Sequence, residues 1–349
     1  MKLRRLLYIA FVAALSMGVV ACNDDELGET IFPEVNETLD PNSYSFQLDS
    51  FLKREYLIPY NLDFCYKMED VGTDMNYNLV PATYEHSVEL AALTKYLWFE
   101  VYDKEMGPEF LRAWGPRMIH LIGSPAFNPV NGTMILGLAE GGIKVSLFRV
   151  NYIDFNPDSL NEYYLKTMHH EFAHILHQTK TYPQEFKLIS SAVYNPSGGQ
   201  NLQDEYVNSM GCVTAYGSSQ EREDFAEIIA NYITKTDEQW EEIMYHAGRN
   251  FEQVGSDPYG NPIYSDEKEE IQDDKGGLAD GIDGVAIINQ KVQIARTWFR
   301  DAWGLDLDAL RAEVQRRQSN INIDSLCNVV YSIGNPVADT TEGDAEINE

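Results

Sequence analysis

Residues 166–178 read KTMHHEFAHILHQ and hold the side chains of this chain best suited to binding a metal ion. Four of the seven histidines of the chain fall within this one stretch. His170 and His174 are four residues apart, so on an α-helix their imidazoles lie on one face, about one turn from each other. Two neutral imidazoles in this relation can bind a single zinc ion and form half of a tetrahedral site.

Glu171 lies between these two histidines and completes the pattern H-E-x-x-H. On a helix its carboxylate flanks the metal position and faces a water molecule bound there, which is the place of a general base for hydrolysis. His177 lies on the same side, but about 10 Å of straight helix separates it from His170. We therefore assign His177 to contacts around the ligands or to packing, and we assign no role to His169, which is turned about 100° away.

The third metal ligand must come from another segment. Residues 221–227, EREDFAE, offer Glu223 and Glu227, which are four residues apart and share one face of a helix. One carboxylate can bind zinc, and the other can accept a hydrogen bond from a ligand histidine and set its tautomer. From the residues alone, either glutamate can be the ligand.

The pair HEFAH and EDFAE resembles the motifs of gluzincin peptidases, including those of the anthrax lethal factor type. This resemblance implies that Glu223 is the metal ligand and that Glu227 stands behind it as a hydrogen-bond partner. It also implies a role for Tyr216, which precedes Glu223 by seven residues. A tyrosine at this offset donates a hydrogen bond to the oxyanion at the scissile carbonyl, where charge appears only in the transition state.

A larger part of the chain is similar to the zinc metallohydrolase lipoproteins found beside TonB-dependent nutrient-import systems of Gram-negative bacteria. The matching segments are a lipobox, NGTMILGLAEGGIKVSLFRVN, HHEFAHILHQ, AYGSSQEREDFAE and WGLDLDALR. Apart from the lipobox they lie between residues 50 and 315. The similarity implies a zinc hydrolase and leaves the substrate unnamed.

The patterns around these motifs indicate the elements that position them. We expect a helix over 159–179, capped by Ser159 or Asn161, and a shorter helix over EDFAEIIANYI. EHSVELAALTKYLWFEVYDKEM predicts an amphipathic helix, RMIHLIGSPAF a short buried strand, and GGIKVSLFRVNYI the clearest strand of the chain. We expect an α+β protein with a zincin-like metallopeptidase fold, a small mixed sheet and an active-site helix. The last of these strands would form the sheet edge, open to an extended peptide.

The second half of the chain alternates between loops and helices. Residues 191–222 indicate a loop and residues 236–250 a helix, whereas residues 255–284 are acidic and rich in glycine and indicate a loop. AIINQKVQIARTWFRDAW and LDALRAEVQRRQ predict two amphipathic helices. We expect one metallopeptidase domain over 42–335 and a disordered tail over 336–349.

Residues 1–21 have the features of a secretory signal, because the basic MKLRR precedes the apolar LLYIAFVAALSMGVV. The run ends in VVAC, which resembles the lipobox of bacterial lipoproteins and implies acylation of Cys22. The alternative is an ordinary signal peptide with an incidental cysteine. Residues 22–41 form an acidic tether, and NDDE after the cysteine resembles a tag for the outer face of the outer membrane. We expect a cell-surface outer-membrane lipoprotein.

Charge and cysteine content exclude other classes of protein. The chain has 26 Lys and Arg against 55 Asp and Glu, a net charge of -29 that repels nucleic acid. Besides Cys22 the chain has Cys65, Cys212 and Cys327. Three thiols cannot form a full disulfide framework, and their wide spacing argues against a cysteine zinc site.

The leading hypothesis is a zinc metallopeptidase in which Zn2+, held by His170, His174 and Glu223, and the base Glu171 activate water to cleave a peptide bond. The alternative is a non-catalytic, zinc-containing accessory or binding lipoprotein of a TonB-dependent nutrient-import system. A zinc hydrolase of a non-peptide amide or ester is a weaker third reading. The implied partners are a peptide or protein substrate, the outer membrane through Cys22, and a TonB-dependent transporter.

Overall fold

The computed structural model describes residues 39–68, 77–127, 134–135, 137–140, 144–269 and 281–333. The compact unit begins at Pro41. The expected signal peptide, Cys22, most of the tether and the tail over 336–349 lie outside the described residues. Within the described ranges, no helix combines the length and the apolar character that crossing a bilayer requires.

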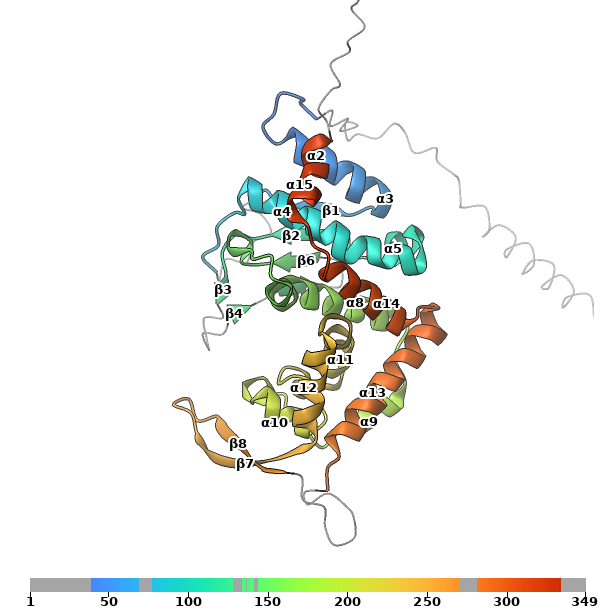
Figure 1. Cartoon of the computed structure of the whole chain (residues 1–349). Coiled ribbons are helices and arrows are strands. Elements are labelled where there is room, and N and C mark those ends of the chain that lie inside the picture. The colour runs from blue at the N-terminus through green and yellow to red at the C-terminus, as the bar shows by residue number, and fades with distance from the viewer. Residues whose placement is uncertain are drawn as a thin grey trace, which may run out of the picture. The chain divides into compact units, whose positions relative to one another are not determined.

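The protein is an α+β protein, as the sequence predicts, with helices around small sheets (Figure 1). The helices are α2 (Phe46–Leu52), α3 (Ile58–Tyr60), α4 (Tyr84–Thr94), α5 (Glu100–Met106), α6 (Pro108–Trp114), α7 (Pro157–Leu160), α8 (Lys166–Thr179), α9 (Gln184–Ile189), α10 (Asp204–Ser209), α11 (Glu221–Thr234), α12 (Asp237–Ala247), α13 (Gly284–Trp298), α14 (Leu307–Gln318) and α15 (Ile323–Ser332). The strands are β1 (Asp63–Cys65), β2 (Met118–Leu121), β3 (Ala126–Phe127), β4 (Met134–Ile135), β5 (Gly137–Glu140), β6 (Lys144–Leu147), β7 (Arg249–Ser256) and β8 (Pro262–Glu269).

The largest sheet among the described residues has the strand order β1-β2-β6-β5. Strands β1, β2 and β6 are parallel and β5 is antiparallel to β6, so the sheet is mixed. The expectation that the strand in GGIKVSLFRVNYI forms the edge is wrong. That strand is β6, and its hydrogen-bonding positions are occupied by β2 on one side and by β5 on the other. A peptide therefore cannot pair with β6.

The helix that bears the histidines begins earlier than expected. It runs without a break through α7, a π-helical turn over Asn161–Leu165, and α8. Its cap is Asn156, whose side chain accepts the N–H of Asp158, with Pro157 at the first helical position. The predicted caps Ser159 and Asn161 are wrong. Asn161 instead donates to the carbonyl of Thr234, which ties this helix to the end of α11.

Helices α8 and α11 lie side by side (Figure 1). Their apolar faces belong to one buried core, to which α8 contributes Phe172 and Leu176 and α11 contributes Phe225 and Ile229. Burial of these side chains stabilises the pair by roughly 1.5–3 kcal/mol for each. The polar faces of the same two helices are thereby brought close to each other.

The expectation of a loop over 255–284 is wrong for the part that the structure describes. Strands β7 and β8 form an antiparallel hairpin there, and α12 ends at Ala247 rather than at 250. The turn over DPYGN uses Asp257, whose carboxylate accepts the N–H of Tyr259 and of Asn261, and Gly260, whose φ is +89°. Most of β7 is exposed and polar, so the alternation that marks a half-buried strand is absent.

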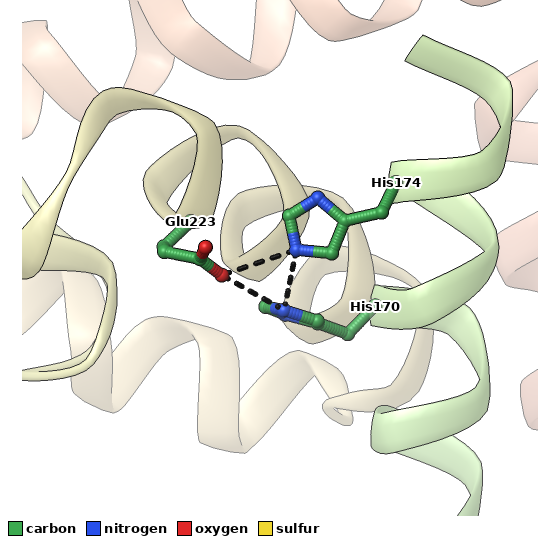
Figure 2. A group of neighbouring side chains, drawn as sticks. All are labelled: His170, His174 and Glu223. Atoms are coloured by element: carbon green, nitrogen blue, oxygen red, sulfur yellow. Dashed lines mark hydrogen bonds and ion pairs between the residues drawn. The ribbon is translucent and has the colours of Figure 1, made fainter. Parts of the chain in front are cut away.

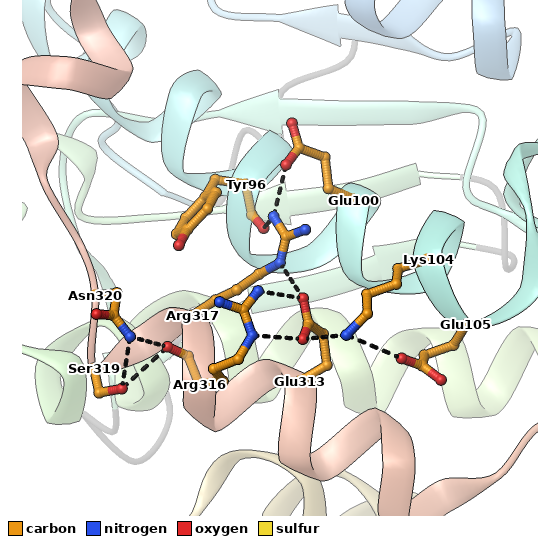
Figure 3. A network of polar contacts seen from close by, with 9 residues as sticks. All are labelled: Tyr96, Glu100, Lys104, Glu105, Glu313, Arg316, Arg317, Ser319 and Asn320. Carbon is orange, nitrogen blue, oxygen red and sulfur yellow. Dashed lines mark hydrogen bonds and ion pairs between the residues drawn. The ribbon is translucent and has the colours of Figure 1, made fainter.

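A network of charged side chains fastens α14 to α5 (Figure 3). Glu313 of α14 is 3% exposed. Its carboxylate accepts hydrogen bonds from Arg316 and Arg317 on its own helix and from Lys104 of α5. Arg317 also bonds Glu100. The hydrogen bonds from Arg316, followed by those from Lys104 and Arg317, outweigh burial and hold the pKa of Glu313 well below the ordinary value of 4.5.

We predict that Glu313→Gln lowers the free energy of unfolding by about 2 kcal/mol at pH 7, because three cations lose their common anion. The folded-state pKa of Glu313 is depressed, so its stabilisation is complete above pH 4.5 and is lost as the pH falls below that value. The difference in free energy of unfolding between the unmodified protein and Glu313→Gln should be about 1 kcal/mol smaller at pH 3.5 than at pH 7. Urea unfolding at both pH values measures it, with the exposed Glu109→Gln as a control that changes little. A difference that does not depend on pH would contradict the prediction.

Candidate metal centre

Helices α8 and α11 bring His170, His174 and Glu223 together (Figure 2). Nε2 of His174 lies 3.0 Å from Nε2 of His170, and Oε2 of Glu223 lies 3.1 Å from the first nitrogen and 3.3 Å from the second. Two ligands of a tetrahedral zinc ion, each at about 2.0–2.1 Å from the metal, lie about 3.3 Å apart. The three atoms already have nearly this spacing, and two imidazoles with one carboxylate are a donor set that zinc accepts. The residues therefore fit a zinc ion.

The structure distinguishes between the two glutamates that the sequence left open. Oε1 of Glu227 lies 2.7 Å from Nδ1 of His170, the ring nitrogen opposite the one that faces Glu223. Oε2 of Glu227 accepts hydrogen bonds from the hydroxyl of Thr214 and the amide of Asn231. Glu227 is thus occupied behind the histidine, where it sets the tautomer that leaves Nε2 free for a metal. Glu223 is the carboxylate that lies beside both Nε2 atoms and could join them in holding a metal ion.

His177 has the same relation to His174 that Glu227 has to His170. Its Nε2 lies 2.8 Å from Nδ1 of His174, and its ring meets those of Tyr182 and Phe225 edge to face. Burial, with a smaller contribution from His174, lowers the pKa of His177 to about 4, so the ring is neutral near pH 7. A neutral imidazole can accept Nδ1–H of His174 and leave Nε2 of His174 for the metal.

His169 takes no part in this group. It is buried, and its Nδ1 lies 3.0 Å from the hydroxyl of Tyr102 in the core. Burial lowers its pKa to about 3, which keeps the ring neutral.

The charges around the donor atoms favour a cation. Burial alone would lower the pKa of His170, but hydrogen bonds and charge from Glu223 and Glu227 outweigh it and raise the pKa to about 10. Burial would raise the pKa of Glu223, and its hydrogen bonds to His170 and His174 instead hold that pKa well below the usual range. The negative field that stabilises a proton on His170 also stabilises a metal ion that replaces that proton.

Glu171 and Tyr216 adjoin the donor atoms. Burial, opposed by the neighbouring histidines, raises the pKa of Glu171 above its ordinary value. Tyr216 is 46% exposed, and its ring centroid lies 5.8 Å from that of His170. Burial of the hydroxyl, with the charge of Glu223 next, raises the pKa of Tyr216. A cavity of about 470 Å³ opens beside Tyr216 and Glu227.

Sequence reasoning did not identify four residues that support this group. Thr214 and Asn231 bond Glu227, Lys166 places its ammonium 3.9 Å from the same carboxylate, and Arg222 lies 3.2 Å from Oε1 of Glu223. Helical spacing could have indicated two of them, because Lys166 precedes His170 by one turn and Asn231 follows Glu227 by one turn. Thr214 gives no such signal, since it comes from a separate segment.

Comparison with known proteins agrees with the donor set. The family described as "Putative zinc-binding metallo-peptidase" matches residues 42–308. The chain belongs to this family. A "putative zinc-binding metallo-peptidase" from Bacteroides caccae, known from its crystal structure, is 36% identical, covers 80% of this chain and 95% of its own, and superposes with a TM-score of 0.61. None of the curated proteins compared with the chain matches it. The expectation of a zinc-binding metallopeptidase family is confirmed.

We predict that His177→Phe weakens zinc binding by the protein about 10-fold or more, because phenylalanine fills the space beside Tyr182 and Phe225 but cannot accept Nδ1–H of His174. Competition with a chromogenic chelator measures the affinity. His86→Phe is the control, since His86 lies on α4 and pairs with Glu89. Equal zinc affinity of His177→Phe and the unmodified protein would refute the role of His177.

Proposed function

We propose that the protein is a zinc-dependent metallopeptidase of the HExxH, gluzincin type that cleaves a peptide bond. The observation that carries this proposal is the convergence of one oxygen and two nitrogens from Glu223, His170 and His174 at the spacing of zinc ligands. Membership of the zinc-binding metallopeptidase family supports it. Glu171 adds a base that a purely structural metal site does not require.

A zinc ion at this position would supply Lewis-acid chemistry, which acidifies water and polarises a carbonyl. Glu171 takes the proton of the attacking water and returns it to the leaving amine. Its raised pKa suits this work, because a base is most effective when its pKa approaches the working pH.

Tyr216 is the proposed donor to the oxyanion that forms at the carbonyl. Its raised pKa keeps the phenol protonated, so the O–H is available to donate. Because the oxyanion appears only as the reaction proceeds, this hydrogen bond lowers the barrier without tightening substrate binding.

The test begins with a proteome-derived peptide library to find a cleaved sequence, followed by kinetics of two variants. We predict that Glu171→Gln lowers turnover by about 10²–10⁴-fold and Tyr216→Phe by about 10²–10³-fold, while metal analysis shows zinc retained in both. Tyr152→Phe, at an exposed tyrosine elsewhere, is the control. Full hydrolysis by Glu171→Gln would overturn the mechanism.

A protein that binds zinc and cuts no peptide would instead favour the alternative, a non-catalytic zinc-containing accessory or binding lipoprotein of a TonB-dependent nutrient-import system.

We further propose that the protein is a lipoprotein of the outer membrane, displayed on the cell surface and acting beside a TonB-dependent transporter. The lipobox ending at Cys22 and the acidic NDDE after it support this location. In cells given a labelled palmitate analogue, we predict that the protein carries label and that Cys22→Ala does not. External protease should digest the unmodified protein on intact cells. An unlabelled protein, or one protected until the cells are lysed, would contradict the lipid anchor or the surface location respectively.

A further inference from the structure

A buried ion pair involves Asp224, the residue that directly follows Glu223 on α11. Lys291 of α13 and Asp224 of α11 are both 0% exposed, and Nζ of the lysine lies 2.5 Å from Oδ2 of the aspartate. Nζ also donates to the carbonyl of Gly211 at 2.6 Å and lies 3.8 Å from Sγ of Cys212. The hydroxyl of Tyr194 donates to the same aspartate oxygen at 2.7 Å. Burial alone would lower the pKa of Lys291, but Asp224 outweighs it and raises that pKa, so the ammonium stays charged.

Stabilisation of the fold does not by itself explain why these two charges are buried as an ion pair. Two charges lose their hydration when they are buried, and an apolar pair of similar volume is often as stable or more so. Oδ1 of Asp224 has no hydrogen-bond partner among the described residues, which adds to the cost. What the pair supplies is a fixed alignment of the elements it joins, because besides Tyr194 its contacts connect α11, α13 and the segment from Gly211 to Tyr216.

The first of these segments is the start of α11. Asp224 directly follows Glu223, so a contact that holds the side chain of Asp224 also fixes the helical turn from which Glu223 reaches the two histidines. The second segment is α13, which carries Lys291 and shares the core with α11.

The third segment runs from Gly211 to Tyr216. Gly211 has a φ of +86°, and a Cβ there would lie 2.3 Å from the side chain of Ile287, so α13 packs directly on this backbone. Lys291 bonds the carbonyl at the same point. Tyr216 lies five residues after Gly211 in the same segment. Between them, the hydroxyl of Thr214 donates a hydrogen bond to Glu227.

We propose that Lys291 is a positioning residue of the metal centre. Through Asp224 and the Gly211 carbonyl it sets the first turn of α11, and with it Glu223, against the segment that carries Tyr216. This role rests on the proposed function for Tyr216, but its consequence for metal affinity is independent of catalysis.

The experiment compares Lys291→Met, which is unbranched and keeps most of the length of the side chain, with Lys291→Met/Asp224→Asn, which removes both charges and keeps an acceptor for Tyr194. Melting temperature and zinc affinity, by chelator competition, are measured on each purified chain. Lys291→Met should melt lower, because it leaves a buried carboxylate without its cation, and the double variant should recover most of that loss. Zinc affinity should fall about 10-fold or more in both variants. If Lys291→Met does not fold, Lys291→Gln, which retains an N–H donor for Gly211, enters the same assays with the same expectation.

Lys104→Met is the control, because it removes the lysine of the Glu313 network and should lower the melting temperature without changing zinc affinity. Recovery of zinc affinity together with melting temperature in the double variant would overturn the proposal, since the pair would then be structural only. Zinc affinity unchanged in every Lys291 variant would overturn it as well. These outcomes can be told apart from a failure of the proposed function. If the unmodified protein does not bind zinc or does not cleave a peptide, the proposed function is refuted. If zinc affinity is unchanged in the Lys291 variants, only the positioning role is refuted.

Discussion

The packing of α8 against α11 is the contact on which the rest of the site depends. Three donor atoms from the two helices must converge to about 3 Å from one another, and a shift of 1 Å in either helix would remove one of them from reach. The apolar faces fix the distance, because Phe172 and Phe225 pack in one close-packed core. The polar faces then meet as imidazoles against carboxylates, so each buried group gains a partner of opposite character.

The two metal-facing histidines are supported differently. His170 has the carboxylate of Glu227 behind it, whereas His174 has the neutral ring of His177. A carboxylate makes the imidazole in front of it a stronger electron donor, and a neutral acceptor does so less. The arrangement also limits the negative charge placed at one buried point, where Glu223 and Glu171 already contribute. The elements that support the site thus tune its charge as well as its shape.

Buried charge recurs in this acidic protein at places where elements from distant parts of the chain meet. Glu313 gathers cations from α5 and α14, and Lys291 joins α13 to α11. Apolar packing is tolerant of small rotations, while a hydrogen-bonded ion pair is directional. Contacts of this kind specify how helices are aligned after hydrophobic burial has brought them together.

The sequence by itself determined the donor types, the helix that carries them, and the α+β class. His170, Glu171 and His174 belong to one helix, so their relation follows from a helical period that is local to the chain. The resemblance to gluzincins indicated Glu223, but the residues alone could not choose between Glu223 and Glu227, because the choice depends on how α11 is rotated against α8.

Tertiary structure decided what depends on distant partners. It placed β6 inside the sheet, since strand order comes from pairing between segments and not from the composition of one strand. It paired β8 with β7, and the residues of β7 are mostly exposed and polar and carry no periodic signal. It also brought Lys291, 67 residues beyond Asp224, into contact with that carboxylate. A local sequence pattern indicates the period of a helix or strand. Contacts such as these form only when the whole core packs, because they depend on which side chains are buried together and not on their spacing in the sequence.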